Sequence, residues 1–199
     1  MRITAKTRMV LPACLMILVF FAGCTVPDSL VSSSRVPEGA SPGQGSVDST
    51  YLRMYENSQN DIAAKMKIMN RCFPASTAIR NAPYMATDLR TAAQELKMAA
   101  DSYHTSMIKV ESFEKKENEL QRNEYLKYLA VIRKSAADIE GAAEGELNGE
   151  FALAQTYAES AQNSLKNIEG IPGTSHEYLL KEIRASLDDY IQKMRERRT

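Results

Sequence analysis

Apolar residues recur at alternate steps of four and three positions along the stretch 84–113, and the same spacing returns in 150–169. Such spacing places the apolar side chains on one stripe of an α-helix, and a stripe of this kind has to be buried against other helices. No strand-like alternation of useful length is present. The first stripe contains Leu89, Ala93, Leu96, Ala100, Tyr103, Met107 and Val110, and the second contains Phe151, Ala154, Ala158, Ala161, Leu165 and Ile168.

Three further helices are predicted by similar spacing. They cover about 50–71, about 119–146, and a last stretch that begins near residue 174. Their apolar positions are Tyr51, Tyr55, Ile62, Met66 and Met69 in the first, Leu126, Leu129, Ile132, Ala136, Ile139 and Ala143 in the second, and Leu180, Ile183, Leu187, Tyr190 and Met194 in the third. About 150 residues can bury a substantial core. We therefore expect 49–199 to be one all-α domain, an antiparallel four- to five-helix bundle with coiled-coil-like seams.

Local signals mark the ends of these helices. Pro74 should close the first helix, and Gly170 with Pro172 resembles a C-cap signature after the helix at 150–169. Thr174 and Glu177 have the spacing of a capping box that would open the last helix.

Two stretches leave alternatives open. The charged run 114–119 contains neither glycine nor proline, yet the stripes on its two sides are out of phase. A reversal into a helical hairpin is favoured over one long helix that changes faces. Gly141, Gly145 and Gly149 recur every four residues in polar surroundings. We expect them to weaken and then end a helix, with a hinge as the functional alternative.

The N-terminus has the features of an export signal. Arg2, Lys6 and Arg8 precede an apolar run from Met9 to Ala22. This run of about 14 residues would form a helix of about 21 Å, shorter than the roughly 30 Å of a bilayer core. An ordinary secretory signal and a retained anchor helix are the alternatives to the assignment that follows.

The run ends in Phe21-Ala22-Gly23-Cys24, which resembles the lipobox of prokaryotic lipoproteins. The resemblance implies that residues 1–23 are a cleaved signal peptide, that cleavage falls between Gly23 and Cys24, and that the Cys24 thiol carries the lipid, the expected palmitate-bearing anchor. It also implies a cell-envelope location. With Thr25 after the cysteine, this is the periplasmic side of the outer membrane in a two-membrane organism, and otherwise the outer face of the cytoplasmic membrane.

The stretch 24–48 is expected to be the lipidated cysteine followed by a flexible linker, because serine, proline and glycine dominate it without a helical period. Such a linker would let the domain reach about 25–30 Å from the membrane. After processing, Cys72 would be the remaining cysteine. It is interpreted as a buried apolar residue, a free thiol or an intermolecular link.

The two histidines are the candidate metal or cofactor ligands. Asp101 and His104 share a helix face, but a diiron bundle needs a second such pair, and His176 has no carboxylate three residues before it. No catalytic motif occurs, so neither an enzyme, a metal nor a cofactor beyond the covalent lipid is expected. Lysine and arginine balance aspartate and glutamate at 25 each, which gives no basic footprint for nucleic acid.

These observations predict a membrane-anchored envelope lipoprotein that acts as a non-enzymatic structural or protein-interaction module. Its partners would be the membrane, through the anchor, and another protein or a second copy, through its helices. The alternative is a small-ligand sensor or carrier, suggested by tyrosines at seam positions: Tyr51, Tyr55, Tyr103, Tyr157 and Tyr190. An enclosed polar cavity would favour the ligand, and a solid core would favour the module. The basic end, from Lys193 to Arg198, suits a helix C-terminus and is also a weak candidate for contact with phosphate polymers.

Overall fold

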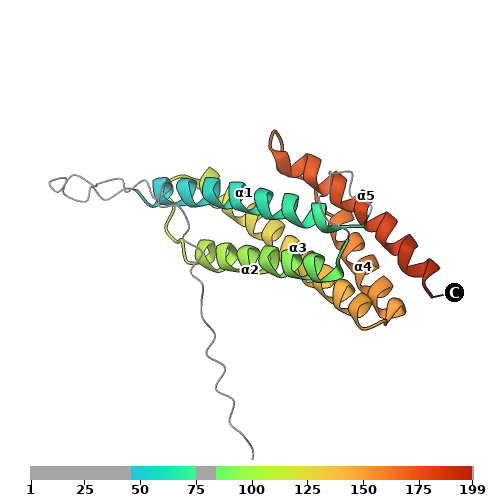
Figure 1. The fold of residues 1–199 in the computed structure, drawn as a ribbon. Helices are drawn as coiled ribbons and strands as arrows, with labels where there is room; N and C mark the ends of the chain where they lie inside the picture. Colours follow the sequence, from blue (N-terminus) through green and yellow to red (C-terminus); the bar gives the residue numbers. More distant parts are fainter. Residues whose placement is uncertain (1–45, 75–83, 199) are drawn as a thin grey trace, which may run out of the picture. The chain divides into compact units, whose positions relative to one another are not determined.

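A computed structural model describes residues 46–74 and 84–198, which form five α-helices (Figure 1). Within these residues there is no strand, so the predicted all-α class is confirmed. None of the described helices combines the length and the apolar character needed to cross a bilayer. The helices are α1 (Val47–Cys72), α2 (Ala86–Ile108), α3 (Lys116–Leu147), α4 (Phe151–Lys166) and α5 (Ser175–Glu196).

The charged run after α2 is a reversal of the chain, as the favoured alternative predicted, and the single long helix is wrong. α2 ends at Ile108, five residues before the predicted end, and α3 begins at Lys116. Side-chain pairs show the antiparallel packing. Lys97 pairs with Glu140 at 2.5 Å, and Asp101, one turn later in α2, pairs with Arg133, about two turns earlier in α3, at 2.6 Å.

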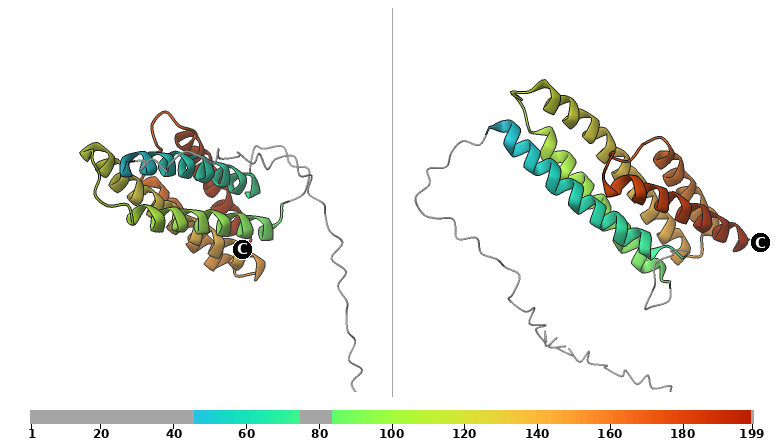
Figure 2. Two further views of the ribbon diagram at one scale, coloured as in Figure 1. Left: turned by 90° about the vertical axis from the view of Figure 1, so that its left-hand side faces the viewer. Right: turned by 90° about the horizontal axis from the view of Figure 1, so that it is seen from above.

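Helix direction alternates through the rest of the bundle (Figure 2). Ser160 of α4 donates to Asp138 of α3, and Arg195 of α5 pairs with Glu159 of α4. α1 and α5 therefore run in the same direction. The contacts between them show the same parallel direction. His176 meets the Gln59 carbonyl near the start of α5, and Ser186, later in α5, donates to Asn70, later in α1.

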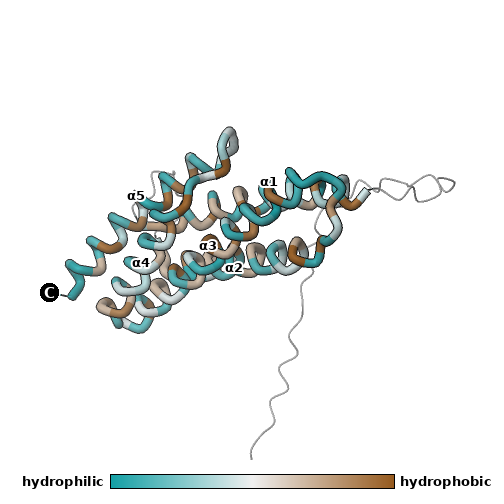
Figure 3. The backbone as a smooth tube through the Cα atoms, turned by 180° about the vertical axis from the view of Figure 1, so that it is seen from behind, coloured by the Kyte–Doolittle hydropathy of each residue, from teal (hydrophilic) through white to brown (hydrophobic). Residues whose placement is uncertain are grey.

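The predicted stripes form the core. Every predicted position of α5 is buried, and so are Leu89, Leu96 and Met107 of α2. Figure 3 shows the same amphipathic pattern as hydrophobic and hydrophilic stretches that alternate along the tube. Val110 and Ile168, the last positions of two stripes, lie beyond the ends of α2 and α4.

Gly141 and Gly145, two of the three glycines near the end of α3, serve close packing, which corrects the expectation that they weaken the helix. A Cβ on Gly141 would lie 3.2 Å from the Tyr157 ring, and one on Gly145 would lie 3.0 Å from the Ala154 nitrogen. α3 runs past both residues to Leu147. Only Gly149, with φ +75°, belongs to the turn into α4, where the positive φ suits a residue without a Cβ.

Gly170 is not a helix cap, because α4 ends four residues earlier, at Lys166, with Asn167 as its C-cap. Instead, the chain at Gly170 passes directly over α5. A Cβ on Gly170 would lie 2.5 Å from the Glu177 nitrogen and nearer still to its Cα. The predicted capping box is half formed. The Thr174 hydroxyl accepts from the His176 amide, but the Thr174 amide donates to Ile171 rather than to Glu177.

The first helix includes Val47 and Asp48, which the sequence placed in the linker. α1 starts at Val47, and the Asp48 side chain is 5 % exposed. Its carboxylate accepts hydrogen bonds from the amides of Glu114 and Lys115, at 3.1 and 3.0 Å. Asp48 therefore fixes the two residues that lead into α3, and its negative charge lies near the positive end of the α3 dipole.

An internal void of about 10 Å³ lies where all five helices meet. The Ser135 hydroxyl lies beside this void, is 2 % exposed and has no hydrogen-bond partner. The other lining side chains are apolar, so a water there would lack the two or more partners that hold buried water.

We expect Ser135→Ala to raise the free energy of unfolding by about 1 kcal/mol, because it removes an unsatisfied buried hydroxyl. Urea denaturation followed by circular dichroism measures the change. Ser186→Ala is the control, since Ser186 donates to Asn70 at 2.8 Å and should lose stability by a similar amount. Equal losses in both variants would contradict the prediction.

Candidate functional site: a tyrosine-lined groove

The predicted lipid attachment lies outside the described residues, as do Gly23, Cys24 and the linker before Ser46. Cys72 is the last residue of α1 and is half-buried. Asp101 pairs with Arg133 of α3 at 2.6 Å, while His104 is half-buried on the same helix. Within residues 46–74 and 84–198 no group of three or more His, Cys, Asp or Glu side chains is arranged to hold a metal ion.

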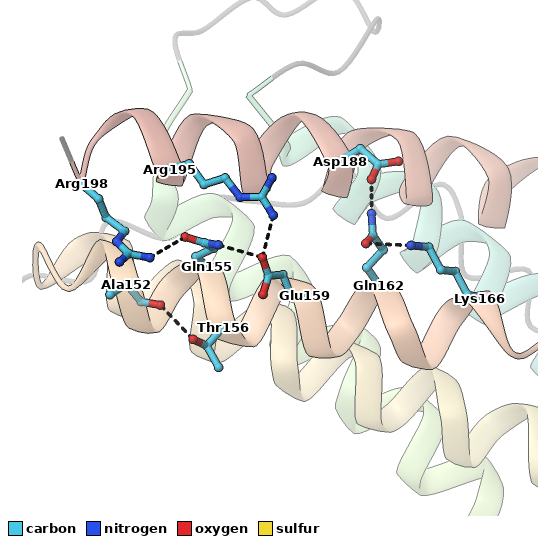
Figure 4. Close-up of polar contacts among 9 residues, drawn as sticks. All are labelled: Ala152, Gln155, Thr156, Glu159, Gln162, Lys166, Asp188, Arg195 and Arg198. Carbon is cyan, nitrogen blue, oxygen red and sulfur yellow. Dashed lines mark hydrogen bonds and ion pairs between the residues drawn. The ribbon is translucent and has the colours of Figure 1, made fainter.

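The basic end of α5 is tied into the bundle. Arg195 pairs with Glu159 at 2.9 Å and Arg198 donates to Gln155 at 3.0 Å, both on α4 (Figure 4). Arg197 pairs with the buried Glu146 of α3 at 2.6 Å, and the Lys193 ammonium lies 4.4 Å from the centroid of the Tyr84 ring. These cations mainly join α5 to its neighbours, so a docking patch for phosphate polymers gains no support from their geometry.

The tyrosines, in contrast, gather between α1 and α3. Tyr55 packs edge-on against Tyr125 with ring centroids 4.7 Å apart, and Tyr125 stacks on Tyr128 at 5.8 Å. Tyr51 extends this row along α1, 5.8 Å from Tyr55. His176 continues it into α5, edge-on to Tyr128 at 5.5 Å. One aromatic row therefore connects three helices.

Hydrogen bonds fix two members of this row. Tyr125 shares a 2.8 Å bond with Ser58 of α1. His176, which is 1 % exposed, meets the Gln59 carbonyl through Nε2 at 2.9 Å and the Tyr128 hydroxyl through Nδ1 at 2.8 Å. Because a carbonyl only accepts, Nε2 must carry the proton, and Nδ1 then accepts from Tyr128. The neutral imidazole is thus fully satisfied.

Burial sets the protonation of these groups. It raises the pKa of Tyr125 and Tyr128 well above the ordinary value for a phenol, so both stay neutral. It lowers the pKa of His176, opposed by the hydrogen bond to the Gln59 carbonyl. The site therefore presents neutral aromatic and hydroxyl groups at neutral pH.

An open groove of about 600 Å³ lies directly beside this row. We call it the tyrosine groove. Its walls are the outer face of α3, the side of α1 and the connection between α4 and α5. The lining residues are Tyr55 of α1, Gln121, Glu124, Tyr125, Lys127, Tyr128 and Val131 of α3, and Asn167, Ile168, Glu169, Gly170, Ile171 and Pro172 of the connection.

The lengths of the helices explain why the groove is open. α3 has 32 residues, whereas α4, which packs against it, has 16. α5 lies over α1 and α3 only from His176 onward, where its contacts to Gln59 and Tyr128 begin. On the side away from α2, the first half of α3 is therefore covered by neither α4 nor α5. The α3 residues that line the groove run from Gln121 to Val131, about 15 Å along the helix axis or roughly three helical turns.

Sequence reasoning found part of this site. Tyr51 and Tyr55 were placed on a seam and do belong to the aromatic row, whereas Tyr103, Tyr157 and Tyr190 lie elsewhere. Tyr125 and Tyr128 were missed because they flank the stripe through Leu126 and Leu129. Tyr125 and Tyr128 are three residues apart, so both lie on one face of a helix, as Tyr51 and Tyr55 do with a spacing of four. This spacing is the sequence signal that indicates a shared tyrosine face.

No family model, no curated protein and no solved structure matches this chain. Over the described residues the structure is a bundle of five helices, each antiparallel to the next along the chain, with an open groove on one side.

Proposed function

We propose that the chain is a lipid-anchored, non-enzymatic interaction module of the cell envelope, and that the tyrosine groove accepts a helical segment of a partner protein. One observation carries the proposal: the groove is lined by Tyr55 of α1 and Tyr125 and Tyr128 of α3, and further along the same two helices α5 packs against both through His176. A short amphipathic helix about three turns long would complete the bundle there.

The chemistry of the groove supports binding rather than catalysis. Its centre offers tyrosine rings and the apolar side chains of Val131, Ile168 and Ile171. Its rim carries Glu124 and Lys127, which pair with each other at 3.0 Å. An apolar centre inside a polar rim is the usual organisation of a protein interface. Nothing in this arrangement activates a nucleophile, and burial keeps the tyrosines protonated.

A small ligand is the second candidate, because about 600 Å³ lies within the usual range for ligand pockets. Such pockets usually enclose most of the ligand, whereas this groove is open along one side, and the void inside the core holds only about 10 Å³. The open shape favours a segment of a partner protein over an enclosed molecule.

The proposal is tested by photo-crosslinking in the organism that makes the protein. A benzophenone amino acid replaces Val131 in the groove, and Met98, an exposed apolar residue of α2, serves as the control position. We expect a discrete protein adduct from position 131 and none from position 98. Equal crosslinking from both, or none from either, would refute a partner in the groove. Native mass spectrometry of the purified protein then tests for a bound small molecule.

The lipid anchor is tested separately by labelling cells with a palmitate analogue. The wild-type protein should incorporate the label, and Cys24→Ala should not. Equal labelling of both proteins would exclude Cys24 as the acceptor. This result would leave the groove proposal standing, because crosslinking at position 131 does not depend on how the chain is held.

A further inference from the structure

We propose that His176 is a pH-sensitive latch: its protonation releases the first turn of α5 from α1 and α3, and thereby moves the wall of the tyrosine groove. The inference adds regulation to the proposed site, and only its functional consequence rests on the proposed function. The structural event itself can be observed in the free protein.

His176 is the point at which the start of α5 is joined to both neighbouring helices. Nε2 donates to the Gln59 carbonyl of α1, and Nδ1 accepts from the Tyr128 hydroxyl of α3. Within the described residues, the other cross-helix hydrogen bonds of α5 to these two helices come from Ser186 onward, more than two turns later. The hydrogen bonds that hold the first turn of α5 to α1 and α3 therefore all pass through one buried imidazole.

The wall of the groove is joined to that turn. The connection 167–172 lines the groove, and Thr174 caps α5 by accepting from the His176 amide at 3.2 Å. Gly170 packs directly on the Glu177 backbone. A displacement of the first turn of α5 must therefore move the connection, because the two are held in van der Waals contact.

Protonation disturbs this arrangement at one atom. When Nδ1 gains a proton it can no longer accept from Tyr128, so the phenol must turn its hydrogen elsewhere. An alternative acceptor beside it is the Met66 sulfur at 3.7 Å, which accepts only weakly. The new positive charge is also buried, 1 % exposed, among tyrosines and apolar side chains.

The surrounding groups provide no compensating anion. His176 contacts the Gln59 carbonyl of α1 and Tyr128 of α3. On α1, Glu56 is exposed, and the half-buried Asp61 hydrogen-bonds to Tyr103 of α2. The charged groups of the groove beside His176, Glu124 and Lys127 of α3 and Glu169 of the connection, are exposed, as is Glu177 of α5, and Glu124 pairs with Lys127. Water screens these charges, so they stabilise an imidazolium only weakly.

The sign of the pH dependence follows from burial. It lowers the pKa of His176 in the folded protein below that in the unfolded chain, about 6.5. Above about pH 6.5 the histidine is neutral in both states and the latch holds fully. As the pH falls below about 6.5 the open state binds the proton more readily, so opening increases until the folded-state pKa is passed.

Hydrogen exchange on the full-length protein in detergent micelles tests the latch. Exchange of residues 167–180 is compared at about pH 7.5 and about pH 5.5, after correction for intrinsic chemical exchange, with the buried segment 129–143 as internal reference. We expect 167–180 to exchange about tenfold faster for each pH unit below about 6.5, down to the folded-state pKa, and 129–143 to remain protected. Exchange that does not change with pH would overturn the proposal.

His176→Gln is the matched variant. Glutamine can donate to the Gln59 carbonyl and accept from Tyr128 but does not titrate, so its exchange should be independent of pH in this range. A response equal to that of the wild type would overturn the role of His176. Should this variant fail to fold, the imidazole NMR signals of the wild type give the titration of His176 directly, with His104 as reference. Exchange of 167–180 must follow that titration, and a mismatch overturns the latch.

Discussion

Gly170→Ala should lower the free energy of unfolding by about 3 kcal/mol and disturb the α4–α5 connection. A Cβ at this position would lie 2.5 Å from the Glu177 nitrogen, and the neighbour is backbone rather than the end of a flexible side chain. Overpacking of this kind typically costs up to about 3 kcal/mol. For a protein of this size the midpoint of thermal unfolding should fall by roughly 6–12 °C. Calorimetry or circular dichroism measures it.

Gly173→Ala is the matched control for this substitution, three residues further along the same connection. Gly173 has φ +73°, but nothing lies within 4 Å of the position its Cβ would occupy. The substitution should therefore cost only the backbone penalty, about 1 kcal/mol. A Gly170 variant as stable as the Gly173 variant would show that the connection does not need the close approach. The groove would then have a wall that can move away from α5 without cost.

Glu146→Ala should also be strongly destabilising, by about 3 kcal/mol. The Glu146 side chain is 5 % exposed and accepts from Tyr190 at 3.0 Å, from Arg197 at 2.6 Å and from the Tyr84 hydroxyl. Removing it leaves buried donors without their acceptor, which costs about 1–3 kcal/mol for each fully buried group. In the variant, the Tyr190 hydroxyl can still donate to the Ala142 carbonyl, and water can reach Arg197, whose side chain is 41 % exposed. The total loss of stability should therefore lie near the lower end of the summed cost of the three donors.

Two variants separate the causes of this loss. Glu146→Gln keeps an acceptor oxygen and removes the charge, so it should lose about 1 kcal/mol. Glu124→Ala removes a carboxylate whose side chain is 75 % exposed and pairs with Lys127, and it should change stability by less than about 0.5 kcal/mol. Urea denaturation of the three proteins measures the differences. Equal effects in Glu146→Ala and Glu124→Ala would mean that the α3–α5 contact does not depend on this carboxylate.

The helices themselves could be predicted from the sequence because a helical stripe is a local pattern. The positions from Leu180 to Met194 follow the period of an α-helix, and all five are buried. The chain reversal near residue 114 was also accessible, since the stripes on its two sides are out of phase. The helix ends were less accurate. α2 ends at Ile108 rather than 113, because the end of a helix depends on what the next segment packs against.

The roles of the glycines show the limit of local reasoning. Gly145 and Gly170 looked like residues that weaken or end helices, because that is how glycine acts within one element. In the folded chain each marks a place where two backbones meet, with Ala154 and Glu177 respectively. The need for a missing side chain arises from the partner element, and no property of the local sequence identifies that partner.

The sequence by itself determined that this protein is helical, which faces of its helices are buried, and where a lipidated N-terminus is expected, because periodicity and short motifs are properties of neighbouring residues. Only the tertiary structure decided where the groove lies. Tyr128 and His176 are 48 residues apart and His176 and Gln59 are 117 apart, yet they form one hydrogen-bonded unit. Their meeting depends on the relative lengths and packing of α3, α4 and α5, which no single segment specifies.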